Sequence, residues 1–252
     1  MTKTVIHQPY FLPWMGYFSK LVYADKFIVL NNVKYSARHY LDRTQIINSQ
    51  GNLMWIKLPI GEPIHKKINE IHFSDSKVVK KILQNLHSSY SKARFFKDNI
   101  PHIENILTDS FKNCDLLSEI NINIGIKIME LLTLKVPQII RSSQFQTVDD
   151  ATDRIIMLCK ENQCDTIIGG SIEGIEIHKV QELTNNNITF LVQDYFNNHP
   201  IYYQTRRTQL GFAKGLSILD CLFNEGIEKT KLLLHDKENI PTLYKPHNLK
   251  YL

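Results

Sequence analysis

The fourteen residues from His7 to Lys20, HQPYFLPWMGYFSK, combine one histidine with five aromatic side chains, two prolines and a glycine. A histidine titrates near neutral pH, so His7 can act as a general base. The rings can wall a pocket for a sugar or a nucleobase, the prolines restrict the backbone, and Gly16 permits a turn or a close approach. We therefore predict a rigid loop that presents His7 and Gln8 to a ligand; the alternative is an aromatic core cluster in which backbone hydrogen bonds satisfy His7. The rings expected to contact the ligand are those of Tyr10, Trp14 and Tyr17.

A second candidate follows the apolar run QII. Arg141 is followed there by the hydroxyls of Ser142 and Ser143, and an arginine beside two hydroxyls can bind a phosphate or a carboxylate. The alternative is a surface arginine beside an ordinary serine turn.

A third candidate is the glycine pair in IIGGSIEG. Gly169 and Gly170 let backbone amides approach a ligand, and a helix beginning near Ser171 would direct its positive end at an anion. The segment lacks the lysine of a P-loop and the third glycine of a dinucleotide fingerprint, so a tight turn is the alternative.

Two further candidates are polar groups in other segments. His199 precedes a proline in the aromatic segment DYFNNHPIYYQTRR, and Asp42 and Arg43 are adjacent in YLDRTQI. The second pair can equally be a surface ion pair, which contributes little to stability. No G-x-S-x-G elbow, H-E-x-x-H motif or pair of carboxylates stands out, so the sequence predicts no metal ligands and names no covalent nucleophile.

Short apolar runs alternate with amphipathic segments and predict the elements that position these residues. Strands are expected within 4–8, 26–32, 53–60, 136–143, 164–170 and 188–195. Helices are expected at 78–92, 116–134 and 151–162, the last capped by the aspartates before it, and at 216–226 with Gly226 as its C-cap.

Strand–helix alternation in the second half is typical of an α/β fold with a mostly parallel sheet covered by helices. Ligands bind such sheets at the carboxyl ends of the strands, where the candidate residues lie. We expect a single compact α/β unit over residues 1–252, with a helical subdomain or insert at 76–135; the alternative is two lobes with a cleft between them.

Composition narrows the class of protein. The chain has 252 residues, 43% of them hydrophobic, which suffices for a packed core. Its four cysteines are scattered without C-x-x-C spacing, which favours a reducing cytoplasm over zinc or disulfides. A net charge of +5 suits an anionic ligand but is short of a nucleic-acid signature. No apolar run is long enough for a membrane span.

The ordered motifs resemble those of the WbqC-like protein family. HQPYFLPWMGYFSK meets its opening pattern H-Q-P-x-x-x-P-W-x-G-Y-x-x-K, and ADKFIVLNNVKY and WIKLPI resemble the next two segments. RSS, IIGGSIEG, VQDYFNNHPIYYQ and LSILDCLFNEG then fall in family order, to about residue 226. The chain departs from the pattern around Arg43, where Asp42 and Thr44 replace two asparagines.

Family members are often found with enzymes that build bacterial surface polysaccharides. The resemblance therefore implies the cytoplasmic nucleotide-sugar stage of O-antigen or capsule assembly. We expect an N-acyl or aminoacyl transferase acting on a nucleotide-linked amino sugar, with an acyl thioester donor (coenzyme A or an acyl carrier protein) and no required cofactor. His7 would be the base, and Arg141 with the Gly169 and Gly170 amides would hold the diphosphate. Further catalytic candidates are His199 and Arg43.

A non-catalytic protein that holds a nucleotide-sugar or a carrier protein for a partner enzyme is the alternative. Nucleotidyl transfer is a weaker option, because no phosphate loop or carboxylate cluster for magnesium stands out. The oligomeric state is left open.

Overall fold

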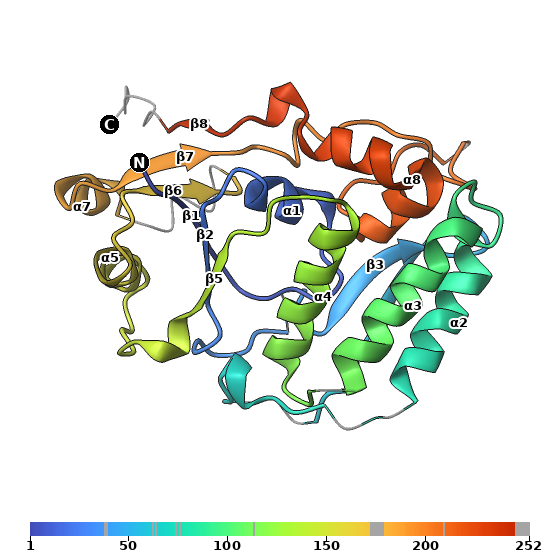
Figure 1. The fold of residues 1–252 in the computed structure, drawn as a ribbon, viewed down its shortest axis with the longest axis horizontal. Coiled ribbons are helices and arrows are strands. Elements are labelled where there is room, and N and C mark those ends of the chain that lie inside the picture. Colours follow the sequence, from blue (N-terminus) through green and yellow to red (C-terminus); the bar gives the residue numbers. More distant parts are fainter. Residues whose placement is uncertain are drawn as a thin grey trace.

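The computed structural model describes residues 1–37, 40–61, 63, 65–73, 75, 77–112, 114–171, 179–208 and 210–244. Strand β1 (Lys3–His7) lies inside a six-stranded sheet of order β5-β2-β1-β6-β7-β8 (Figure 1). Within the described residues each pairing is parallel, except that of β7 with β8. The predicted α/β fold with a mostly parallel sheet is therefore confirmed. The other strands are β2 (Lys26–Val29), β5 (Gln138–Arg141), β6 (Thr166–Gly169), β7 (Thr189–Val192) and β8 (Thr242–Leu243).

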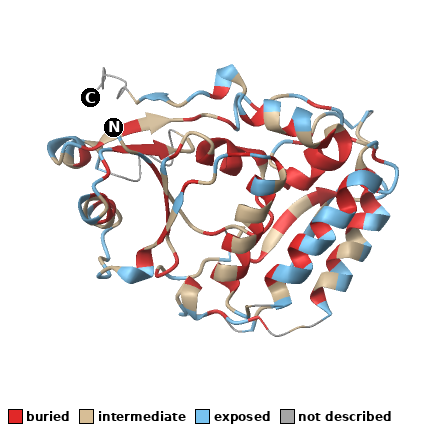
Figure 2. Cartoon of the chain, viewed as in Figure 1, coloured by how far each residue is buried: buried red, intermediate tan, exposed pale blue. Residues whose placement is uncertain are grey.

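Helices cover both faces of this sheet (Figures 1 and 2). Helices α5 (Ala151–Glu161) and α7 (Val180–Asn185) cover one face, where Ile155 and Leu183 pack against Ile28 and Ile167 of the strands. Helix α1 (Met15–Leu21) and helix α8 (Ile218–Leu234) contribute to the larger core on the other face. Strands covered on both faces explain why the sequence shows continuous apolar runs there.

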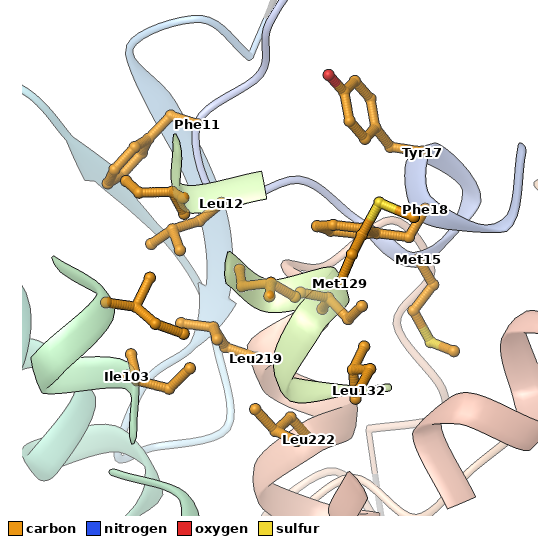
Figure 3. Close-up of a cluster of buried hydrophobic side chains, with 14 of the residues drawn as sticks. Phe11, Leu12, Met15, Tyr17, Phe18, Ile103, Met129, Leu132, Leu219 and Leu222 are labelled. Atoms are coloured by element: carbon orange, nitrogen blue, oxygen red, sulfur yellow. The ribbon is translucent and has the colours of Figure 1, made fainter. Parts of the chain in front are cut away.

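The larger core joins α1 and α8 to three more helices (Figure 3). Phe11, Leu12, Met15 and Phe18 from the segment after β1 are at most 1% exposed and belong to the same buried cluster as Leu219 of α8. The other helices of the described residues are α2 (Val78–Tyr90), α3 (Phe96–Lys112) and α4 (Leu117–Leu131), with short 3-10 helices at Ile68–Glu70, Ser142–Gln144 and Lys237–Asn239.

The helices α2, α3 and α4 fall within the segment expected to form a helical subdomain, whose boundaries stay a prediction. Beside them, β3 (Arg43–Ile47) and β4 (Leu53–Lys57) form a separate antiparallel pair. The strand expected at 53–60 thus lies outside the main sheet, and β3 has no counterpart among the predicted strands.

One local expectation needs correction. The opening segment is a rigid loop only to Trp14, because Met15–Leu21 forms α1. The helix expected to end at Gly226 does so, because Gly226 has non-helical backbone angles (φ +79°, ψ 178°); a second helical segment follows the kink and extends α8 to Leu234. The ring of Phe95 packs closely against Gly226: a Cβ added to the glycine would lie 3.1 Å from the nearest ring atoms. The helix expected near Ser171 would occupy residues outside the described part of the chain.

Candidate functional site

A cavity of about 660 Å³ lies at the carboxyl ends of β1, β6 and β7. From β1 the chain proceeds to β2 and β5 on one side of the sheet, and then to β6 and β7 on the other. Ligand sites in open parallel sheets lie where the strand order reverses in this way. Five of the predicted residues line the cavity: His7, Tyr10, Trp14, Gly169 and Gly170.

His7 is the last residue of β1 and faces this cavity. Its Nδ1 lies 2.9 Å from the backbone oxygen of Gln8, which can only accept, so Nδ1 carries the proton of the neutral ring. The lone pair is therefore on Nε2, the atom that can take a proton. The rings of Tyr10 and Tyr17 pack edge-on against the imidazole at 4.6 and 5.2 Å between centroids.

Aromatic rings form the walls of the cavity. Tyr10 contacts Tyr40 at 5.6 Å, and Trp14 contacts Phe196 at 6.0 Å; all four line the cavity. Tyr17, expected to contact the ligand, is 5% exposed and lies behind His7, where its hydroxyl donates to the Gln8 oxygen at 3.4 Å. The walls can stack on a sugar or a base, whereas Tyr17 positions His7.

Two charged residues of the cavity were not among the predicted site residues. Lys20 lies in the last turn of α1 and lines the cavity, and the residue is only 6% exposed. Burial lowers the pKa of its ammonium to about 8. Asp194, two residues beyond β7, also lines the cavity, and both its oxygens accept from Asn197 Nδ2 at 3.0 and 2.9 Å. The signal for Lys20 was its place as the final letter of the opening family pattern.

His199 lies behind the cavity wall and does not line it. Its imidazole stacks on Trp14 at 6.3 Å with 28° between the planes, and its Nδ1 donates to the Pro200 oxygen. Burial lowers the pKa of His199. A neutral ring packed on the indole supports the orientation of Trp14.

Arg141, Ser142 and Ser143 form a separate cluster at the ends of β5 and β2. Arg141 makes two hydrogen bonds to Glu119 of α4, at 2.8 and 2.6 Å. Ser142 Oγ donates to the side-chain oxygen of Asn32 at 2.5 Å, and the Ser143 amide donates to that of Asn31. The serine bonds tie the end of β5 to the end of β2, the arginine bonds tie β5 to α4, and none of the three predicted residues lines the cavity.

Asp42 and Arg43 also lie apart from the cavity lining. Arg43 Nε donates to Asp42 Oδ1 at 3.0 Å, and Nη2 donates to Oδ2 at 3.3 Å. Gln8 contributes its backbone oxygen to His7, while its side-chain oxygen is buried with no hydrogen-bond partner among the described residues.

In the described part of the chain, no three His, Cys, Asp or Glu side chains gather closely enough to hold a metal ion. Nor does any described helix combine the length and apolar character needed to cross a membrane.

Comparisons with known proteins agree with the resemblance seen in the motifs. An uncharacterized protein of Mycobacterium tuberculosis, Rv1507c, is 26% identical over 242 residues, covering 94% of this chain and 100% of the relative. No solved structure matches the chain significantly. The sequence model of the WbqC-like protein family matches residues 8–232, a span that includes every lining residue of the cavity except Ile6 and His7. The chain therefore belongs to the WbqC-like protein family.

Proposed function

We propose that this protein transfers an acyl or aminoacyl group to the amine of a nucleotide-linked amino sugar, in the cavity at the ends of β1, β6 and β7. The observation that supports it is the meeting of His7 with aromatic walls in one cavity of about 660 Å³. That volume is within the range of about 300–1,000 Å³ found for small-molecule sites.

In the proposed reaction, Nε2 of His7 takes a proton from the sugar amine as the amine attacks the thioester carbonyl. A carbon–nitrogen bond forms, the carbon–sulfur bond breaks, and the protonated imidazole returns its proton to the departing thiolate. A positioned base of this kind contributes about 100- to 10,000-fold in rate.

The aromatic walls and the family association supply the substrate class. Aromatic rings stack on sugars and bases, and four of them line the cavity: Tyr10, Trp14, Tyr40 and Phe196. Because family members accompany enzymes of surface-polysaccharide assembly, we place the reaction at the nucleotide-sugar stage of O-antigen or capsule synthesis, in the cytoplasm, with coenzyme A or an acyl carrier protein as the thioester carrier.

A non-catalytic holder of the same nucleotide-sugar is the second candidate. It is favoured by one observation: Arg141 and Arg43, expected at the substrate, are each paired with a carboxylate away from the cavity lining. A holder needs the aromatic walls but no turnover.

The test starts with a thermal-shift screen against UDP- and dTDP-amino sugars and acyl thioesters. A ligand at about 100 times its Kd stabilises the protein by about 2.7 kcal/mol. Product formation is then measured by mass spectrometry for the wild type, for His7→Ala, and for His102→Ala as a control at an exposed histidine of α3.

The proposal predicts turnover that drops at least about 100-fold in His7→Ala, with ligand affinity retained, and no change in His102→Ala. Binding without any product would replace the enzyme by the holder. Full turnover in His7→Ala would remove His7 as the base.

A further inference from the structure

We infer that Lys20 is the anion-binding residue of the cavity and holds a phosphate group of the ligand by its ammonium. The identity of the ligand as a nucleotide-sugar rests on the proposed function; the phosphate contact itself rests on the geometry of Lys20.

The placement of Lys20 is unusual for a lysine. Lysines are almost never fully buried unless paired, yet this residue is 6% exposed. Its side chain extends from α1 past the ring of Tyr17, 6.0 Å from Nζ to the ring centroid, to the backbone of Gly170. A Cβ added to Gly170 would lie 3.2 Å from Nζ, so the glycine gives the ammonium its room at the end of β6.

The groups around Lys20 do not neutralise it. Among the described residues, no hydrogen bond or ion pair links its Nζ to a protein acceptor. Asp194 is the only carboxylate among the lining residues described, and both its oxygens already accept from Asn197. In the described part of the chain, the other titratable groups that line the cavity or contact Lys20 are His7, Tyr10, Tyr17 and Tyr40, none of which supplies a negative charge near neutral pH.

An unpaired, buried ammonium is costly in the empty cavity and becomes favourable when an anion enters. A lysine is a common phosphate ligand because its compact charge donates three hydrogen bonds. The nearby aromatic walls then receive the base or the sugar attached to the phosphate. Burial lowers the pKa of the free ammonium to about 8, so anion binding above that pH requires proton uptake.

The experiment compares UDP, inorganic pyrophosphate and uridine as probes by isothermal titration calorimetry. Wild type, Lys20→Met and Lys20→Arg are measured, with Lys229→Met as a control for the loss of one exposed charge on α8. Thermal melting of each variant verifies that it is folded.

Lys20→Met is expected to weaken UDP and pyrophosphate binding by about 10- to 100-fold, as for loss of one charged hydrogen bond, and to leave uridine unchanged. Lys20→Arg keeps the charge and is expected to retain more affinity than Lys20→Met, and Lys229→Met to match the wild type. Between pH 7.5 and 9.5 the wild-type affinity for UDP is expected to fall, approaching tenfold per pH unit above 8, whereas that of Lys20→Met stays flat.

Equal UDP affinity in Lys20→Met and wild type would overturn the phosphate contact. Failure of UDP and pyrophosphate to bind the wild type would overturn it as well. If either result is obtained while the wild type still converts an amino-sugar nucleotide, the proposed function stands and only the role of Lys20 is lost. Lys20-dependent UDP binding without any transfer product would leave Lys20 in place and remove the transferase.

Discussion

The indole of Trp14 lies directly on the backbone of Gly16. A Cβ added to Gly16 would be 2.3 Å from Cη2 of the indole and 2.6 Å from Cζ2 and Cζ3. Real Cβ atoms do not approach a ring so closely, so the W-x-G spacing of the opening segment allows the ring to lie flat against α1. With His199 stacked on Trp14 as well, the cavity wall has a fixed orientation.

Gly16→Ala is expected to displace this wall. The added methyl forces the rigid indole to move, and overpacking of this kind costs about 1–3 kcal/mol. The measurement is chemical unfolding together with Trp14 fluorescence in a Trp55→Phe background, since Trp55 is the other tryptophan and is 42% exposed. We expect a shifted emission maximum and weaker ligand binding. Unchanged emission and stability would show that the ring does not rest on Gly16.

Lys20→Met is expected to stabilise the protein at pH 7 by about 1–3 kcal/mol, because it removes an unpaired buried charge. Burial lowers the pKa of Lys20 from 10.5 to about 8, so the unfolded chain binds the proton more tightly than the folded one. The cost is fully present below pH 8 and is lost progressively as the pH rises from 8 to 10.5. Urea unfolding at pH 7, 9 and 10.5 tests this: the gain from Lys20→Met should shrink with pH, and a constant gain would contradict the lowered pKa.

Asp220 is expected to make the stability of the protein fall, not rise, with increasing pH, and to do so at acidic pH. It is fully buried, accepts hydrogen bonds from the hydroxyls of Tyr90 and Tyr202, and burial raises its pKa from 3.8 to about 6. The folded state therefore holds the proton more tightly than the unfolded state. Relative to Asp220→Asn, the wild type should lose about 3 kcal/mol of stability as the pH rises from about 4 to 6.

Unfolding free energies of the Asp220 pair at pH 4, 5, 6 and 7 provide the measurement. A difference that is the same at every pH would mean that the carboxyl titrates alike in the folded and unfolded chain.

Arg141→Gln is expected to leave ligand affinity unchanged, because Arg141 is held by Glu119 outside the cavity lining. A double-mutant cycle with Glu119→Gln should give a coupling of about 0.5–1 kcal/mol, since the side chains of Arg141 and Glu119 are 36% and 22% exposed and solvent screens the pair. A tenfold loss of UDP affinity in Arg141→Gln would return this residue to the site.

Much of the fold could be predicted from the chain because buried parallel strands leave continuous apolar runs, as in Phe27–Val29. The direction of the chain also shows which end of each run is its carboxyl end, and His7 and Gly169 were rightly expected at such ends. No apolar run shows which strands are neighbours in the sheet. Arg141 ends a strand too, but two strands, β2 and β1, separate its strand β5 from β6, which ends at the glycine pair.

The residues that were missed have ordinary local sequence. In YFSKL, Lys20 resembles a surface lysine of an amphipathic helix, and its burial beside Tyr17 and Gly170 is visible only in the fold. In DRTQI, β3 lacks the alternation of a half-buried strand, so its pairing with β4 depends on contacts that are distant along the chain.

The central position of β1 also governs the order in which the chain can fold. Its second neighbour is β6, and Thr2 donates to Asp165, 163 residues further along. At about 5–20 residues per second, a ribosome needs roughly 10 to 30 s between the two segments. During synthesis one edge of β1 must therefore wait with its backbone groups unpaired. Because Gly169 of β6 lines the cavity together with His7 of β1, a ligand finds the complete cavity only after β6 has docked.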